Sequence, residues 1–169
     1  LKHSSKRQIS EETMKEKELK IQTPDGLMTT FVTVPEENGP HPIILFLMDA
    51  PGKREELHDM ARRFATVGYY VMLPNLYYRT SNDFVSDFSE KSRVIQRQHM
   101  AALNQQMVVN DCKVLIQYTA EDRDAKDGPI GCVGYCMSGP FAFAAASQIS
   151  NRIRASASIH GVNLCNGSK

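Results

Sequence analysis

Four short apolar runs, separated by longer amphipathic or polar segments, set the pattern of this chain. They occupy residues 43–48, 69–73, 130–135 and 153–159. Continuous apolar runs of this length are typical of strands that helices cover on both faces, as in a parallel sheet. We therefore expect four core strands that belong to one sheet.

The segments between these runs have helical spacing. Helices are predicted over residues 54–67, 91–120 and 137–149. In the first, Leu57, Met60 and Phe64 fall on one face, and Gly68 follows where a C-terminal glycine is expected. An irregular stretch over residues 75–90 precedes the long second helix. Buried strands that alternate with helices predict an α/β fold with a mostly parallel sheet flanked by helices.

The first part of the chain is polar and leads into a hairpin. Residues 1–16 are predicted as a polar N-terminal extension, and the globular domain is expected over residues 17–169. Residues 18–23 alternate between polar and apolar, Pro24-Asp25-Gly26 has turn chemistry, and residues 27–34 read as a second strand. This pair predicts an antiparallel hairpin at one edge of the sheet.

The composition and charge of the chain argue against several classes of protein. The chain has 169 residues and a net charge of +1, which argues against a dedicated nucleic-acid binder. No apolar stretch approaches the ~20 residues of a membrane span, and no signal-peptide pattern is visible. The four cysteines form neither a disulfide framework nor zinc-ligand spacing. We expect a cytoplasmic protein with no metal, cofactor, nucleic-acid partner or membrane.

The candidate reactive residue follows the third apolar run, where a cysteine lies between a predicted strand and a predicted helix. In such a turn Gly134 lets the strand approach the helix, while Ser138 and Gly139 let the helix start close to the sheet. Negative charge is favoured at a helix N-terminus, so Cys136 is predicted to react as a thiolate. The Met137 N–H is then one oxyanion donor.

The alternative for a cysteine after a strand is a small buried hydrophobe. That interpretation is the better one for Cys132 in the strand and for Cys112 on a helix face. A serine-nucleophile pattern centred on Ser138 fails, because position 136 is Cys and position 140 is Pro.

The segment Gly134-Tyr135-Cys136-Met137-Ser138-Gly139 resembles the G-Y-C-x-G-G motif of the dienelactone hydrolase family, with one glycine replaced by Ser138. Residues 69–79, with Gly68 before them, resemble the family's G-Y-x-x-x-x-P-D-L-Y-x-R stretch, with Asn75 at the acid, and residues 23–26 match its common opening. The resemblance runs from about Lys17 to Leu164. It implies an α/β-hydrolase core and hydrolysis of a small ester or lactone.

The family resemblance also implies residue roles. Its triad is Cys, Asp and His in chain order, and Cys136 matches the nucleophile. Asp49 takes the place of a family glutamate that contacts the thiol, although a loop or cap role is the alternative. The Ala50 N–H corresponds to the second oxyanion donor. Arg93 or Arg97 would lie near a substrate carboxylate, with a plain surface role as the alternative.

The ends of the chain raise a further expectation. The sequence begins at Leu1 and stops at Lys169, soon after the fourth core run. We expect a fragment without the C-terminal strands, whose acid and histidine lie beyond Lys169. His160 comes too early in this pattern and is expected to line or pack against the pocket.

Three functions remain open at this point. The first is a hydrolase in which Cys136 forms a thioacyl intermediate. The second is a non-catalytic relative that binds a ligand or self-associates through an open sheet edge. The third is a redox-responsive thiol, which would need no histidine.

Overall fold

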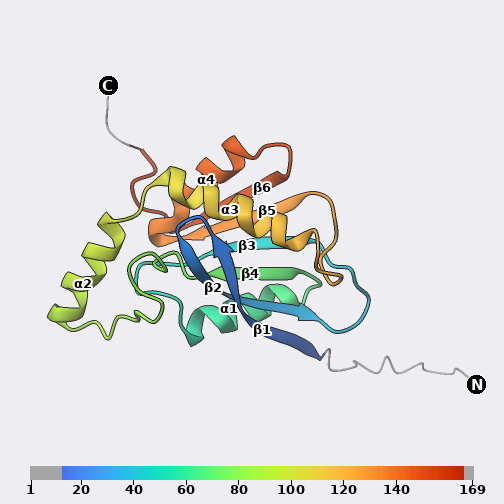
Figure 1. Cartoon of the computed structure of the whole chain (residues 1–169), viewed down its shortest axis with the longest axis horizontal. Helices are drawn as coiled ribbons and strands as arrows, with labels where there is room; N and C mark the ends of the chain where they lie inside the picture. Colours follow the sequence, from blue (N-terminus) through green and yellow to red (C-terminus); the bar gives the residue numbers. More distant parts are fainter. Residues whose placement is uncertain (1–12, 166–169) are drawn as a thin grey trace, which may run out of the picture.

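The computed structural model describes residues 13–165, and these form one mixed sheet with helices on both faces (Figure 1). The sheet order is β1-β2-β4-β3-β5-β6. The strands are β1 (Met14–Thr23), β2 (Gly26–Pro35), β3 (Ile43–Leu47), β4 (Tyr70–Pro74), β5 (Ile130–Tyr135) and β6 (Ile153–Ile159). β4, β3, β5 and β6 are mutually parallel, which confirms the expected α/β sheet.

The N-terminal hairpin is present at the predicted edge. β1 pairs with β2 in antiparallel register, and β2 pairs with β4 in the same sense. Gly26 closes the turn with a φ of 131°, a conformation that favours glycine. β1 begins at Met14, so residues 14–16 of the predicted extension belong to the strand. Residues 1–12 of that extension lie outside the described residues.

The helices are α1 (Glu55–Ala65), α2 (Glu90–Ala101), α3 (Gln105–Thr119) and α4 (Gly139–Gln148), with a short 3₁₀ turn, η1 (Cys136–Ser138), before α4. α1 lies on one face of the sheet, while α3 and α4 lie on the other (Figure 1). The prediction of one helix over residues 91–120 was wrong. α2 ends at Ala101, and Asn104 caps the start of α3, because its Oδ1 accepts a hydrogen bond from the Met107 N–H at 2.9 Å.

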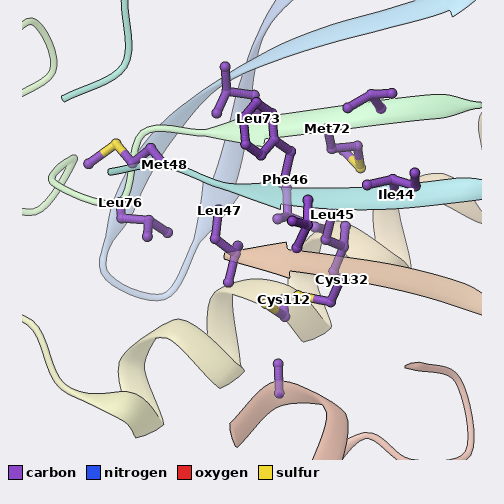
Figure 2. Packing of buried hydrophobic residues seen from close by; sticks show 14 of the residues in the cluster. Ile44, Leu45, Phe46, Leu47, Met48, Met72, Leu73, Leu76, Cys112 and Cys132 are labelled. Carbon is purple, nitrogen blue, oxygen red and sulfur yellow. The ribbon is translucent and has the colours of Figure 1, made fainter. Parts of the chain in front are cut away.

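The core lies between the central strands and the helices. All five residues of β3 and of β4 are buried. Figure 2 shows part of this cluster, in which the sulfur-bearing side chains of Cys112 on α3 and Cys132 on β5 lie close together. Both side chains are buried, which confirms the prediction that they pack in the core. A hydrogen bond with Cys132, together with burial, raises the pKa of the Cys112 thiol.

β6 departs from the prediction of a buried core strand. It is the last strand of the sheet among the described residues, and of its seven residues Ile153 alone is buried. An apolar hollow of about 290 Å³ runs beside it on the α1 face, with Phe64, Val133 and Ile159 in its lining. The open face of β6 therefore exposes apolar surface that a central strand would hide.

Candidate active site

The candidate site is at the edge of the sheet where the four parallel strands end. There β3 leads into Asp49 and Ala50, β4 leads into Tyr77, and β5 leads into Cys136. Ligands of open α/β sheets bind at this carboxyl edge. The fold thus brings together segments that are far apart in the sequence.

The turn at Cys136 is sharp and strained. Cys136 has a φ of 52°, in the left-handed region that side-chain-bearing residues adopt rarely. A Cβ at Gly134 would lie 2.0 Å from the Ser138 carbonyl oxygen, and one at Gly139 would lie 2.9 Å from the Gly161 Cα. Glycine is therefore required at both positions for the strand and the helix to approach this closely.

Ser138 joins this turn to the loop that follows β3. Its side chain is fully buried, and its Oγ donates a hydrogen bond to the carbonyl oxygen of Met48. A glycine at this position could not form that bond. The departure from the family motif at Ser138 therefore adds a direct tether between the cysteine turn and residues 48–51.

The carbonyl groups of residues 48–51 all have partners. Besides the Met48 contact, the Asp49 carbonyl accepts from the Gly52 N–H at 3.4 Å. The Pro51 carbonyl accepts from the Ser86 N–H at 2.9 Å. The Ala50 carbonyl accepts from the Tyr77 hydroxyl at 2.9 Å. This loop, which carries one of the two expected oxyanion donors, is consequently fixed along its whole length.

Asp49 is bound by a cation. Arg54 donates to Oδ1 at 2.6 Å and to Oδ2 at 2.9 Å, which is a bidentate pair, and both side chains are largely shielded from solvent. The hydrogen bond that Arg54 donates to Asp49 raises the pKa of Arg54 despite partial burial. The structure thus gives the carboxylate a partner that the sequence did not suggest. The expected contact of Asp49 with the Cys136 thiol stays a prediction.

Tyr77 is the side chain that links the three segments of the site. It is 1% exposed, its hydroxyl donates to the Ala50 carbonyl, and the same hydroxyl lies 3.2 Å from the Met137 Sδ. Burial raises the pKa of Tyr77 well above its usual range, and the nearby side chains of Asp49 and Cys136 add to this effect. The phenol therefore remains a hydrogen-bond donor at all physiological pH values.

A hollow of about 260 Å³ opens beside the cysteine turn. It is lined by Met100, Gln105, Met137, Pro140, Phe141, Val162 and Asn163. Two of these residues flank the cysteine directly: Met137 follows Cys136, and the Val162 N–H donates to the Cys136 carbonyl at 3.1 Å. The lining contains apolar side chains and two amides, without a charged group. The hollow is suited to an uncharged part of a ligand.

Four histidines lie within the described residues. His41 and His58 contact Gly68 and Glu55, away from the carboxyl edge. His99 on α2 stacks on Tyr77 with ring centroids 5.1 Å apart, and burial lowers its pKa. His160 is exposed after β6, and its ring meets the edge of Tyr135 at 5.9 Å. That contact agrees with the packing role expected for His160.

The two predicted substrate arginines, Arg93 and Arg97, are both exposed on α2. This helix buries only Ser92, and it extends outward from the sheet (Figure 1). A substrate contact for either arginine stays a prediction, and the plain surface interpretation fits their exposure.

Sequence reasoning missed the contacts of Tyr77 and Arg54 and the tether made by Ser138. The only feature of the sequence that pointed to a role for Tyr77 was its place in the stretch of residues 69–79 that resembles the family motif. Within residues 13–165, no cluster of three or more His, Cys, Asp or Glu side chains is arranged to hold a metal ion. In the same part of the chain, every helix is too short or too polar to cross a membrane.

This strand order, with its hairpin edge and its cysteine turn at the carboxyl end of β5, defines an α/β-hydrolase fold. The chain belongs to the dienelactone hydrolase family, whose model matches residues 28–168. The resemblance found in the sequence is thereby confirmed.

Individual relatives agree with this assignment. A carboxymethylenebutenolidase of Pseudomonas putida is 25% identical over 131 residues, which is 77% of this chain and 55% of the relative. A relative in Methylorubrum extorquens is 27% identical over 122 residues, 72% of this chain and 41% of that protein. The chain therefore spans about half the length of the curated relatives it matches.

Solved structures show the same fold. A crystal structure from Klebsiella pneumoniae superposes with a TM-score of 0.75 at 19% identity, over 92% of this chain and 63% of that one. A dienelactone hydrolase from Anabaena variabilis superposes with a TM-score of 0.65 at 15% identity, over 88% of this chain and 64% of that one.

Proposed function

We propose that this chain carries the nucleophile half of a hydrolase that cleaves small esters or lactones through Cys136. One observation carries the proposal: Cys136 adopts a φ of 52° at the strand-to-helix turn, beside a loop tethered to that turn by Ser138. A strained nucleophile at this position is the nucleophile elbow of α/β-hydrolases. The family match and the names of the relatives support the same chemistry.

The proposed reaction begins with the Cys136 thiolate. Its sulfur bonds to the carbonyl carbon of the ester, and the C=O π electrons move to the oxygen. The N–H groups of Met137 and Ala50 donate to that oxyanion. Collapse of the tetrahedral species expels the alcohol oxygen, which takes up a proton, and leaves a thioacyl enzyme. Water then attacks the thioester, which releases the carboxylic acid and restores the thiol.

A base is needed to form the thiolate and to activate water. His99 contacts Tyr77 and Thr80, and His160 is exposed at the end of β6. Neither matches the position of the family's histidine. The proposal therefore assigns the acid and the histidine of the triad to chain outside residues 13–165, as the family pattern implies.

The hollow beside the turn supports the choice of substrate. Its 260 Å³ volume and uncharged lining, with Met100, Met137 and Phe141, suit the apolar part of a small ester. Some relatives carry the name carboxymethylenebutenolidase, which denotes an unsaturated lactone as substrate. Small aryl esters and lactones are accordingly the first substrates to test.

The test is turnover of p-nitrophenyl acetate and of a simple lactone by the natural full-length protein. Cys136→Ala should abolish turnover of both, since the variant lacks the sulfur that is proposed to form the thioacyl intermediate. Cys165→Ser, at an exposed cysteine beyond β6, is the matched control and should leave turnover unchanged. Full activity in Cys136→Ala would refute the proposal.

Self-association through the sheet edge is a second candidate, and the exposed β6 with its apolar hollow favours it. Unpaired strand edges attract further strands. Sedimentation velocity over a range of concentrations would show a dimer in the wild type and less of it in Ile159→Lys. A monomer at every concentration would remove this candidate.

A further inference from the structure

One hydroxyl group contacts both residues that are proposed to bind the oxyanion. The Tyr77 Oη donates to the Ala50 carbonyl at 2.9 Å and lies 3.2 Å from the Met137 Sδ. A single phenol proton has one best acceptor, and a carbonyl oxygen accepts more strongly than a thioether sulfur. The bond to Ala50 is therefore the directional one, and the sulfur is a packing neighbour.

That bond fixes the peptide that joins Ala50 to Pro51. The residue after Ala50 is Pro51, which has no N–H, so the Ala50 carbonyl is the only hydrogen-bonding group of the peptide that joins them. Rotation of this peptide would turn the backbone at Ala50 and move its N–H. The hydroxyl of Tyr77 thus fixes the direction of the proposed oxyanion donor from the opposite side of the residue.

The phenol ring is itself held in place. It stacks on His99 with centroids 5.1 Å apart, and Phe84 meets it edge-on at 6.1 Å. The Tyr77 N–H donates to the Asn75 Oδ1 at 3.0 Å, which secures the backbone below the ring. Rigid support of this kind is what a preorganised donor pair needs.

We propose that Tyr77 is a positioning residue, which holds the Ala50 and Met137 N–H groups in the geometry of the oxyanion. The inference rests on the proposed function, because it presupposes a tetrahedral intermediate at Cys136. Tyr77 does not touch the substrate in this account. It acts through the backbone of Ala50 and the side chain of Met137.

The test compares Tyr77→Phe with Tyr78→Phe in the natural full-length protein. Tyr78 is the matched control, because its hydroxyl is also buried and bonded but contacts Thr23 and Asp111, away from the turn. Tyr77→Phe should lower kcat for p-nitrophenyl acetate by about tenfold, less than the ~100-fold or more that follows loss of an oxyanion donor. KM should stay the same in both variants, and kcat should stay the same in Tyr78→Phe.

Two further measurements separate positioning from structure. A trifluoromethyl ketone adds to the thiolate and forms a tetrahedral oxyanion, so Tyr77→Phe should weaken its binding by about the same factor as kcat. Alkylation of Cys136 by iodoacetamide forms no oxyanion, so its rate should not change. A fall in both the alkylation rate and kcat would mean that the turn has shifted, which contradicts the proposal.

The remaining outcomes are also decisive. If Tyr77→Phe keeps the wild-type kcat while Cys136→Ala is inactive, the inference is wrong and the proposed function stands. If Cys136→Ala is active, the proposed function fails, and the inference fails with it. Loss of folding in Tyr77→Phe alone would assign the hydroxyl to domain stability, against the proposal.

Discussion

The Oγ of Ser138 donates a hydrogen bond to the carbonyl oxygen of Met48, across 90 residues of sequence. One partner sits in the turn that carries Cys136, and the other begins the loop that carries Ala50. The bond is buried, so water cannot replace it. It couples the position of the cysteine to the position of the loop that would complete an oxyanion site.

Ser138→Ala should therefore both destabilise the domain and reduce its activity. The Met48 carbonyl would be left buried without a donor, which costs about 1–3 kcal/mol in free energy of unfolding. Urea denaturation measures this loss. Ser147→Ala, at an exposed position of α4, should change the free energy of unfolding by less than about 0.5 kcal/mol. Equal effects at the two serines would count against the tether.

Gly134→Ala should disrupt the turn more severely. The added Cβ would lie 2.0 Å from the Ser138 carbonyl oxygen, so the backbone of the turn would have to move. We expect a loss of roughly 1–3 kcal/mol or more, with loss of Cys136 reactivity. Gly131→Ala in the same strand is the control, since its Cβ would meet Ile44 Cγ1 at an ordinary 3.5 Å. Similar unfolding curves for both variants would contradict this account.

The ion pair between Asp49 and Arg54 should affect how readily the Cys136 thiol reacts. Arg54→Met removes the cation that both carboxylate oxygens contact, so an uncompensated negative charge remains on Asp49, which the predicted contact with Cys136 would place beside the thiol. We expect slower alkylation of Cys136 by iodoacetamide, because a nearby negative charge disfavours the thiolate. The double variant Arg54→Met/Asp49→Asn should restore the wild-type rate. A rate that falls further in the double variant would refute the electrostatic explanation.

The buried hydroxyl of Tyr78 should make the domain sensitive to alkali. Burial raises the pKa of Tyr78 to about 12, from about 10 in an unfolded chain. The folded state therefore binds this proton more tightly, and the contribution to stability is present below pH ~10 and is lost as the pH rises through about 12. The free energy of unfolding should fall over this window in the wild type. The decline should be shallower in Tyr78→Phe, and identical pH profiles would show that Tyr78 is not its source.

The core strands and the hairpin could be predicted from the sequence, because their apolar and alternating patterns depend on local burial. It also located the cysteine turn, since a sharp turn admits only small residues such as Gly134 around it. The break between α2 and α3 escaped prediction because Asn104, a helix cap, resembles any polar residue on a helix surface. The exposure of β6 could not be predicted, because the composition of a segment indicates an apolar strand but not which elements pack against it.

The internal contacts of the site were beyond the reach of sequence patterns. The hydrogen bond of Ser138 to Met48 and that of Tyr77 to Ala50 each join segments that are distant in sequence. Nothing near Arg54 marks it as the partner of Asp49, although the two are only five residues apart. Such contacts depend on the packing of the whole sheet, and they decide how the predicted residues can act.

The most direct test of the account is to trap the acyl group on the enzyme. The natural full-length protein is mixed with p-nitrophenyl acetate, quenched in acid within the first turnovers, digested and examined by mass spectrometry. The account predicts an acetyl group on the sulfur of Cys136 that disappears as turnover ends. Productive turnover with no acyl group on Cys136, or with the acyl group on another residue, would contradict the central claim that this cysteine is the nucleophile.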